Sequence, residues 1–241
     1  LTETLAMIPD DIPVILDAKR NDIGSTADGY VRFVFDVLGV DAVTVNPYLG
    51  GDAVAPFLAR VDKGIIVLCR TSNPGAHDLQ DLTSGGAPLY QHVARLAQTW
   101  NTAGNVWLVM GATSPSELAW ARANFPQMWF LSPGVGAQGG ALEQALRAGQ
   151  TPAGDGSLSI ASRSIMGAAN PRAAALEMRD AINVVRAEVR AAAKHVEAVG
   201  EGATQYEELA LALFDAGCVQ FGSFTLKSGQ ASPIYLDLRR M

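Results

Sequence analysis

The sequence contains little cysteine and little histidine. Its 241 residues include 2 cysteines, Cys69 and Cys218, and 3 histidines, and neither type recurs at the spacing of a metal-binding motif. Two cysteines that lie far apart in the chain exclude a disulfide-rich framework and a cysteine-based zinc site. We therefore expect no structural metal, and the low cysteine content fits a reducing, cytoplasmic environment.

Positive charge and long apolar runs are also scarce. Lys and Arg number 18 against 24 Asp and Glu, which gives a formal net charge of -6. That balance argues against a nucleic-acid or anionic-membrane surface as the main partner. No segment has the length and composition of a signal peptide or a membrane span. With 49% hydrophobic and 17% charged residues, the composition is that of a globular protein with room for one large domain or two small ones.

Apolar strands and amphipathic helices alternate along residues 13–193. The segment 25–38, for example, carries apolar residues at helical spacing, and Ser114 with Glu117 has the composition of a capping box. Continuous apolar strands separated by helices indicate a parallel sheet. The predicted strands are 13–17, 42–46, 65–69, 106–110, 128–131 and 158–161, and the predicted helices are 25–38, 52–61, 86–103, one that begins at 115, 141–148 and 171–193.

Two architectures fit these strand–helix units, a doubly wound open sheet and a (β/α)8 barrel. A doubly wound sheet would place a glycine-rich phosphate loop after its first strand, and the sequence after 13–17 has none. Each predicted strand is instead followed by a loop rich in Gly, Pro and polar residues, which is where barrel enzymes build their sites. We therefore predict an α/β fold, a TIM barrel that lacks its first two strand–helix units. The helical residues 1–10 and the first residue, Leu1, indicate that those units precede the chain.

The pattern changes after the last predicted helix of the barrel. Residues 194–204 are small and polar and include two glycines, which predicts a linker. The predicted domains are therefore a partial barrel over 1–193 and an incomplete second domain over 205–241, which is too short to build a core alone. Within the second domain we predict a helix up to residue 216 and strands over 219–226 and 234–238.

The strongest chemical signal lies at the end of the first predicted strand. Asp17 and Lys19 are two residues apart, so on a strand their side chains point to the same side. A carboxylate and an ammonium at the end of a buried strand are costly unless they pair, and the pairing keeps the lysine protonated and able to donate a proton. Asp22 follows on the turn into the next helix. The same spacing also fits a strand end with ordinary surface charges, and spacing alone does not separate the two interpretations.

Four segments together resemble a known enzyme family. The segment Asp17-Ala18-Lys19-Arg20-Asn21-Asp22-Ile23 is similar to the Asp-x-Lys-x-x-Asp signature of the orotidine 5'-monophosphate decarboxylases, which catalyse the last step of UMP synthesis. Residues 71–75 resemble the family's loop over the pyrimidine, 132–140 its phosphate-side loop, and 162–165 its phosphate-gripping arginine turn. The four segments follow different predicted strands in the family's order. Their amino-acid sequences resemble those of a bacterial, mycobacterial-like subgroup of the family.

The last part of the chain resembles a second enzyme. Residues 224–235 are similar to the N-terminal segment of orotate phosphoribosyltransferase, which catalyses the preceding step. The phosphoribosyl-diphosphate loop of that family is absent from residues 205–241. The resemblance implies a decarboxylase fused at its C-terminus to a phosphoribosyltransferase, in a bifunctional protein from which this chain is cut at both ends.

The resemblance to the decarboxylases implies the catalytic roles. Loss of CO2 from pyrimidine C6 leaves a carbanion, and Lys19 is expected to donate the proton that it needs. Asp17 is expected to hold Lys19 and to lie against the departing carboxylate. Asp22 and Thr26 are expected to reach across a homodimer interface into the partner's site. No cofactor and no metal are needed, and the expected ligands are orotidine 5'-monophosphate and UMP.

The same resemblance implies a set of binding residues. Ser72 is expected to bond the pyrimidine, and Arg163 to grip the phosphate with two parallel hydrogen bonds. Gln138 and backbone amides near Gly136 and Ser164 are expected to help hold the phosphate. The expected substrate-binding residues are Ile23, Thr26, Ser72, Pro133, Gly136, Gln138, Arg163 and Ser164.

The resemblance is incomplete at the N-terminus, which leaves alternatives open. The family also uses an aspartate from its first strand and a lysine from its second, and both would precede Leu1. The chain by itself is therefore expected to show little or no decarboxylation. One alternative is a Mg²⁺-dependent decarboxylase or aldolase of keto-sugar phosphates, because that barrel group shares the Asp-x-Lys-x-x-Asp pattern. The other is an inactive truncated piece that at most binds UMP or associates with a partner.

Overall fold

The chain forms two compact units, Leu1–Arg190 and Ala191–Met241. The computed structural model describes residues 1–134, 139–205, 219–225 and 231–236. In this described part of the chain, every helix is too short or too polar to cross a membrane.

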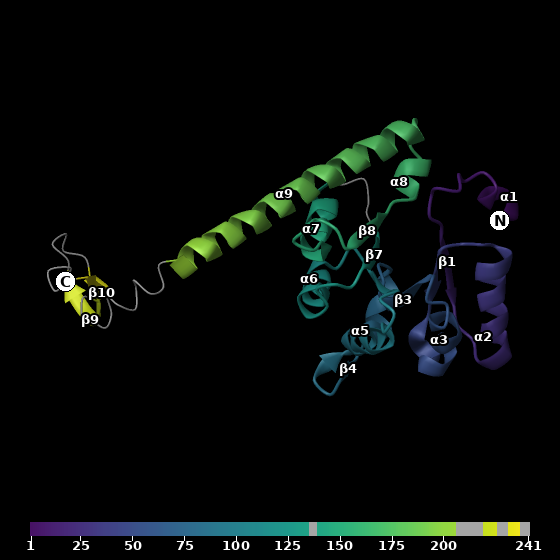
Figure 1. Cartoon of the computed structure of the whole chain (residues 1–241), viewed down its shortest axis with the longest axis horizontal. Coiled ribbons are helices and arrows are strands. Elements are labelled where there is room, and N and C mark those ends of the chain that lie inside the picture. Colours follow the sequence, from purple (N-terminus) through teal and green to yellow (C-terminus); the bar gives the residue numbers. More distant parts are fainter. Residues whose placement is uncertain (135–138, 206–218, 226–230, 237–241) are drawn as a thin grey trace. The chain divides into compact units, whose positions relative to one another are not determined.

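A parallel sheet of six strands forms the centre of the first unit (Figure 1). Its strand order is β1-β2-β3-β6-β7-β8, and every neighbouring pair is parallel. Because the strands run in one direction, their carboxyl ends lie at one edge of the sheet, which we call the C-terminal edge. The strands are β1 (Ile15–Arg20), β2 (Ala42–Val45), β3 (Gly64–Arg70), β6 (Val106–Met110), β7 (Phe130–Pro133) and β8 (Ser157–Ile160).

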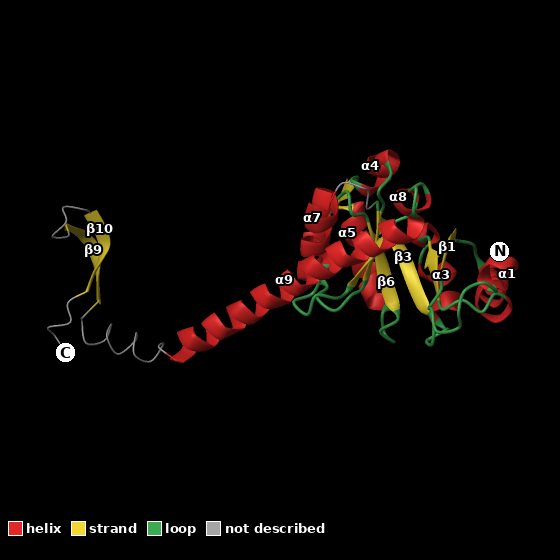
Figure 2. Cartoon of the chain, turned by 90° about the horizontal axis from the view of Figure 1, so that it is seen from above, coloured by secondary structure: helices red, strands yellow, loops and turns green. Residues whose placement is uncertain are grey.

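Helices cover one face of this sheet. Alternate strand residues such as Val43 and Val67 point into a core that they share with Val34, Phe57 and Leu146 of the helices. Figure 2 shows the helices of this unit in red around the yellow strands β3 and β6. Helix α5 contacts both of these strands. The main helices are α2 (Gly24–Val31), continued by a π-helix over Arg32–Val37, α3 (Gly51–Leu58), α5 (Leu89–Trp100), α6 (Pro115–Asn124), α7 (Gly139–Gly149) and α9 (Pro171–Gln205).

The opposite face of the sheet carries its own apolar cluster. Its members come from the other set of alternate strand positions, as the period of two in a strand requires. A doubly wound fold would place helices on both faces, whereas a barrel places them outside and packs side chains inside. The sheet is therefore an open half-barrel, and the prediction of an α/β barrel architecture is confirmed. The inner cluster consists of Ala42, Ile66, Val109 and Leu131, with Ile15, Leu68, Trp107 and Ile160 packed against it.

Two predicted boundaries are wrong. The helix predicted over 86–103 begins at Leu89, because Gly85 and Gly86 have positive φ angles of 56° and 81° and turn the chain between the short strands β4 (Thr83–Ser84) and β5 (Ala87–Pro88). Helix α9 continues to Gln205 across the segment predicted as a linker. Glycines inside a helix cost only about 1 kcal/mol each, so two of them do not end a long helix rich in alanine and glutamate.

Short helical turns occupy several connections. The segment predicted as a loop after β8 forms the one-turn helix α8 (Arg163–Met166), and α4 (His77–Gln80) follows the loop after β3. The short helix α1 (Thr2–Leu5) corresponds to part of the predicted helical residues 1–10. Two 3-10 turns lie at Pro47–Leu49 and Pro74–Ala76.

The starts of α9 and α6 differ in their caps. Asn170 Oδ1 accepts a hydrogen bond from the N–H of Ala173 at 3.1 Å and so caps the start of α9. At α6 the predicted capping box is wrong, because Ser114 makes no side-chain cap bond. Glu117 is engaged instead by Arg70 Nη2 at 3.3 Å and by Ser116 Oγ at 2.7 Å.

At the opposite edge of the sheet, before β7 and β8, Arg122 joins several chain segments through hydrogen bonds. Its guanidinium donates to the backbone carbonyls of Phe125, Pro126, Met128, Gly149 and Gly156 at 2.7–3.3 Å. The same group lies 4.1 Å from the centre of the Phe130 ring. Burial lowers the pKa of Arg122 to about 10, which leaves the group charged at neutral pH.

In the second unit, β9 (Val219–Thr225) and β10 (Ala231–Leu236) form an antiparallel pair. These strands match the two predicted over 219–226 and 234–238, with the second beginning earlier. The predicted helix up to residue 216 lies mostly outside the described residues, which resume at Val219.

Candidate active site

The predicted site residues occupy the C-terminal edge of the half-barrel. Each lies at the end of a parallel strand or on the segment that follows it, so the sheet brings them to the same edge although they are far apart in sequence. Those that the structure describes come from β1 (Asp17, Lys19), the segment after β1 (Asp22, Ile23), the first turn of α2 (Thr26), the loop after β3 (Ser72), the end of β7 (Pro133) and α8 (Arg163, Ser164). Gly136 and Gln138 lie outside the described residues.

Asp17 and Lys19 form a direct ion pair on the same side of β1, as their spacing predicts. Lys19 Nζ donates to Asp17 Oδ2 at 2.6 Å. Thr44 of β2, which is fully buried, donates from Oγ1 to Asp17 Oδ1 at 2.8 Å and accepts from the Lys19 N–H at 2.9 Å. Both carboxylate oxygens of Asp17 are therefore bonded. The side chains of Asp17 and Lys19 are 53% and 51% exposed, so the pair faces open space beyond the edge of the sheet rather than the buried core.

The backbone of Lys19 departs from that of a strand. Its φ is 49°, a left-handed value found at no other non-glycine residue in the described chain. The register of β1 against β2 shifts between Leu16 and Arg20, which is the sign of a bulge. A left-handed side-chain residue costs about 1–3 kcal/mol and persists where its surroundings fix it, most often at functional sites. Here the bond from the Lys19 N–H to Thr44 fixes the bulge and aims the ammonium at Asp17.

The residues expected to reach a partner subunit lie just beyond this pair. Asp22 Oδ1 accepts from the N–H of Ile23 at 2.8 Å, and Ile23 is 59% exposed at the start of α2. Thr26 is exposed on the first turn of α2. Within the described residues, none of the three is hydrogen-bonded to Lys19; Asp22 is half-buried, whereas Ile23 and Thr26 are exposed.

The loop that carries Ser72 is wedged between two glycines. A Cβ built on Gly134 would lie 2.9 Å from the Ser72 Cβ, and one built on Gly111 would lie 3.2 Å from the Ser72 backbone. Gly134 also has a φ of 94°. These close approaches bring the loop after β3 against those after β6 and β7, so the predicted pyrimidine loop and the start of the predicted phosphate loop are neighbours.

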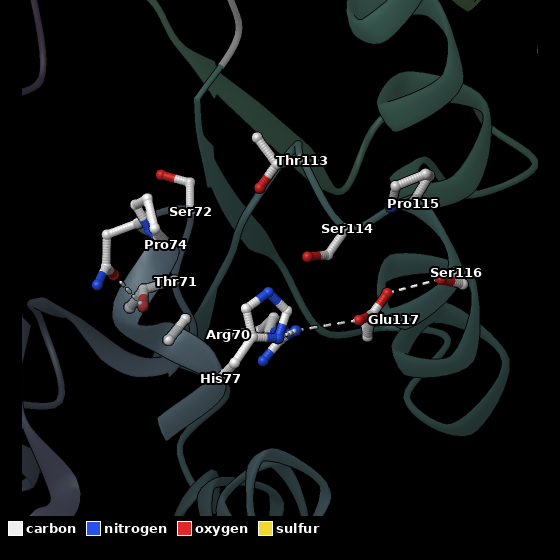
Figure 3. Close-up of a pocket in the computed structure, with 12 residues that line it drawn as sticks. Arg70, Thr71, Ser72, Pro74, His77, Thr113, Ser114, Pro115, Ser116 and Glu117 are labelled. Carbon is white, nitrogen blue, oxygen red and sulfur yellow. Dashed lines mark hydrogen bonds and ion pairs between the residues drawn. The ribbon is translucent and has the colours of Figure 1, made fainter. Parts of the chain in front are cut away.

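A pocket of about 360 Å³ opens beside the Ser72 loop, between it and the start of α6 (Figure 3). Arg70, the last residue of β3, lies beneath it with its side chain only 3% exposed. Its guanidinium donates to Asp81 at 2.6 Å and to Glu117 at 3.3 Å. The hydrogen bond with His77, aided by the charge of Arg70, holds the pKa of Asp81 below its usual 3.8. Among the predicted site residues, Ser72 lines this pocket.

The predicted phosphate residues lie on β7 and α8. The backbone carbonyl of Pro133 accepts from the Ala112 N–H at 2.8 Å, which ties the end of β7 to β6. Arg163 is exposed and forms no ion pair within the described residues. Ser164 Oγ is buried and without a hydrogen-bond partner there. A buried hydroxyl without a partner is unusual, and a ligand oxygen is one group that would satisfy it.

Other candidate chemistry is limited. In the part of the chain that the structure describes, no cluster of three or more His, Cys, Asp and Glu side chains is arranged to hold a metal ion. Burial raises the pKa of the Cys69 thiol, whose Sγ donates to the Tyr90 carbonyl at 3.1 Å, so this cysteine is not a reactive nucleophile.

Sequence reasoning missed two residues of this edge. Thr44 is a hydroxyl at an inward position of an otherwise apolar strand, and that mismatch with the binary pattern was the available signal. Arg70 gave no comparable signal, because its partners are 11 and 47 residues away in the sequence.

Comparison with known proteins shows the family to which the chain belongs. Residues 4–178 match the model of the orotidine 5'-phosphate decarboxylase / HUMPS family. Orotidine 5'-phosphate decarboxylase from Azoarcus sp. (strain BH72) is 55% identical over 183 residues, which are 73% of this chain and 68% of that protein. The enzyme of the same name from Thermomicrobium roseum is 50% identical over 205 residues, 81% of this chain and 73% of that protein.

The fold of this chain is also similar to solved structures of related proteins. Leishmania donovani OMP decarboxylase has a TM-score of 0.73 and 46% identity, covering 77% of this chain and 72% of that chain. Leishmania donovani UMP synthase has a TM-score of 0.75 and 47% identity, and covers 99% of this chain, which spans about half (51%) of that protein. On the family match and these identities, the chain belongs to the orotidine 5'-phosphate decarboxylase family of enzymes.

Proposed function

We propose that this chain carries the decarboxylation of orotidine 5'-monophosphate to UMP, with Lys19 as the proton donor. The observation that carries the proposal is the Lys19–Asp17 ion pair, held by Thr44 at the C-terminal edge of a half-barrel of this family. In the reaction the bond from pyrimidine C6 to the carboxylate breaks and CO2 leaves. The electron pair stays on C6 and takes a proton from Lys19 Nζ, and the resulting neutral amine regains a proton from solvent.

Asp17 has two tasks in this scheme. Its Oδ2 fixes the position of Nζ. We assign its negative charge to a position against the departing carboxylate of the substrate. Two like charges at close range are unfavourable, and the loss of CO2 relieves that repulsion. The Lys19 ammonium meanwhile stabilises the negative charge that develops on C6. No cofactor or metal takes part in these steps.

The remaining predicted residues hold the two ends of the substrate. We assign Ser72 to the pyrimidine, and Arg163 with Ser164 to the phosphate. The exposed Arg163 guanidinium and the buried, unpartnered Ser164 Oγ support the phosphate assignment. Pro133, Gly136 and Gln138 belong to the same phosphate-side set by their place on and after β7.

We further propose a homodimer in which Asp22 and Thr26 reach into the partner's site. The exposure of Thr26 and of nearby Ile23, on the segment that follows β1, supports this assignment. Ile23 is a large apolar side chain that is 59% exposed, and an interface would bury it.

The second unit carries a separate proposal. We infer that residues 205–241 begin an orotate phosphoribosyltransferase domain, so that the parent protein is bifunctional. The UMP synthase match covers 99% of the chain whereas the match to the decarboxylase from the same organism covers 77%, and the difference supports a second domain. The Mg²⁺-dependent alternative is not favoured, because the curated relatives quoted above are orotidine 5'-phosphate decarboxylases.

The proposed function is tested in the complete protein that contains this chain, by following the loss of orotidine 5'-monophosphate absorbance. We expect turnover without added metal and retention of activity in a chelator. A requirement for Mg²⁺, or turnover of a keto-sugar phosphate in place of the nucleotide, would overturn the assignment.

A further inference from the structure

Arg70 connects three parts of the C-terminal edge. It ends β3, it donates from Nη1 to Asp81 Oδ1 at 2.6 Å at the end of α4, and it donates from Nη2 to Glu117 Oε1 at 3.3 Å in the first turn of α6. Its guanidinium also lies 5.8 Å from the Tyr90 ring centre. With 3% of its side chain exposed, Arg70 is a buried cation held by two carboxylates, which is costly unless the geometry is maintained.

The bond between Arg70 and Asp81 closes the segment that contains Ser72. Just inside it, the Thr71 N–H donates to Gln80 Oε1 at 2.9 Å, and Gln80 Nε2 donates to Thr71 Oγ1 at 2.8 Å. The base of the loop is therefore fastened twice, by an ion pair and by a reciprocal pair of hydrogen bonds. Glu117 fastens the same base to the next strand–helix connection.

Ser72 is the residue that this arrangement leaves available. Its side chain makes no hydrogen bond within the described residues, while its backbone lies against Gly111 and its Cβ against Gly134. Figure 3 shows its hydroxyl pointing away from the Arg70–Glu117 contact. The loop is held rigidly at its base and presents one free hydroxyl, which suits a group that must meet a ligand at a fixed place.

We propose that Arg70 is a positioning residue, which acts through Asp81 and Glu117 to hold the Ser72 hydroxyl where it bonds the pyrimidine. The inference rests on the proposed function, because it takes the pyrimidine as the ligand of Ser72. Arg70 itself touches no substrate in this account. Its effect on the reaction therefore passes through Ser72.

A double-mutant cycle tests this dependence. Loss of the Ser72 hydrogen bond in Ser72→Ala is expected to lower kcat/KM about 10-fold, and Arg70→Met is expected to lower it by a similar factor. Because both changes remove the same contact, the double variant is expected to lose about 10-fold rather than the roughly 100-fold of two independent effects. A loss of about 100-fold in the double variant would overturn the positioning role.

Ligand binding separates positioning from general destabilisation. Arg70→Met is expected to weaken binding of UMP while leaving binding of ribose 5-phosphate, which lacks the base, unchanged. Equal weakening of both ligands would show a structural role only. Arg60→Gln is the matched control, because Arg60 makes a 2.7 Å ion pair with Asp36 before β3, at the other edge of the sheet, and its loss is expected to change neither affinity.

Two further variants keep the test decisive. If Arg70→Met does not fold, Glu117→Ala enters the same cycle, since it removes one of the two anchors and its own side chain is 22% exposed. Glu117→Gln keeps an oxygen acceptor for Arg70 and is expected to restore most of the activity lost in Glu117→Ala. These variants are made in the same protein as the test of the proposed function, the complete one that contains this chain. If that protein shows no decarboxylation without substitutions, the proposed function fails, whereas independent effects in an active enzyme overturn the positioning role alone.

Discussion

Two arginines join neighbouring segments at opposite edges of the half-barrel, and their hydrogen-bond acceptors differ. Arg122 closes the edge before β7 and β8 with bonds to the backbone carbonyls of five residues. Arg70 closes the C-terminal edge with bonds to the carboxylates of Asp81 and Glu117. The first set of acceptors belongs to the backbone at strand and helix ends. The second set belongs to side chains, of which Glu117 lines a pocket together with Arg70.

The difference in acceptors assigns the two arginines different roles: the Arg122 contacts stabilise the fold, and the Arg70 contacts support the active site. Backbone carbonyls are present whatever the side chains are, so the Arg122 contacts hold secondary-structure ends together and offer nothing to a ligand. The Arg70 contacts instead hold a loop that leaves the Ser72 hydroxyl free, at the same edge of the sheet as the end of β1, which carries Asp17 and Lys19. In a parallel barrel the C-terminal edge carries the site and the opposite edge carries stability. The predictions below test that division.

The largest expected effect is that of Lys19→Ala on kcat. The change removes the proton donor and the cation that faces the forming carbanion, and a positioned general acid contributes about 10²–10⁴-fold. Affinity for UMP, which is anchored by its phosphate, is expected to stay close to that of the wild type. Steady-state kinetics and calorimetric titration of UMP measure the two effects separately.

Two variants sharpen this test. Lys19→Arg is not expected to restore activity, because a guanidinium is a poor proton donor with a different reach. Lys63→Ala removes a lysine that precedes β3 at the opposite edge, and its kcat is expected to match the wild type. Near-normal turnover by Lys19→Ala would remove Lys19 from the mechanism.

Arg122→Met is expected to lower the free energy of unfolding by about 3 kcal/mol. The change leaves several carbonyls without their charged donor, and each hydrogen bond to a charged group is worth about 1.5–3 kcal/mol before relaxation and hydration recover part of it. Urea denaturation measures the loss. Below the unfolding transition, kcat/KM is expected to be unchanged, and a selective loss of activity in a fully folded variant would break the division between the two edges.

Arg163→Ala is expected to weaken UMP binding by about 1.5–3 kcal/mol, because it removes charge-assisted hydrogen bonds to the phosphate. Its stability is expected to stay close to that of the wild type, since Arg163 is exposed. Isothermal titration gives the affinity. Arg179→Ala is the control, as Arg179 bonds Asp180 on the surface of α9, and unchanged affinity in Arg163→Ala would take Arg163 out of the site.

The smallest expected effect concerns pH and Asp81. The bond with His77 and the charge of Arg70 hold the pKa of Asp81 below its usual 3.8 in the folded protein. The folded state therefore binds fewer protons than the unfolded state, and this contribution to stability is present above pH 3.8 and is lost as the pH falls through the lowered pKa. The stability difference between wild type and Asp81→Asn should shrink on acidification. A difference that is constant with pH would show that Asp81 is not coupled to Arg70 and His77.

The sequence predicted the features that depend on local pattern. Apolar runs gave the six parallel strands, and because parallel strands end at one edge, residues as distant as Lys19 and Arg163 were expected together. The Asp17–Lys19 pair followed from the period of a strand.

The features that sequence reasoning missed depend on tertiary contacts. The left-handed backbone at Lys19 requires the Thr44 hydroxyl from a neighbouring strand, and nothing in the residues around Lys19 encodes it. The capping box at α6 was wrong for a similar reason. Glu117 has a stronger partner in the buried cation of Arg70, 47 residues away, than in the helix start.

The most direct test of the central claim is a crystal structure of the complete protein with UMP. The account predicts that pyrimidine C6 lies against Lys19 Nζ, that the base meets the Ser72 hydroxyl and that the phosphate meets Arg163. A UMP molecule bound elsewhere, such as in the pocket between Arg70 and Glu117, or with C6 turned away from Lys19, would contradict it.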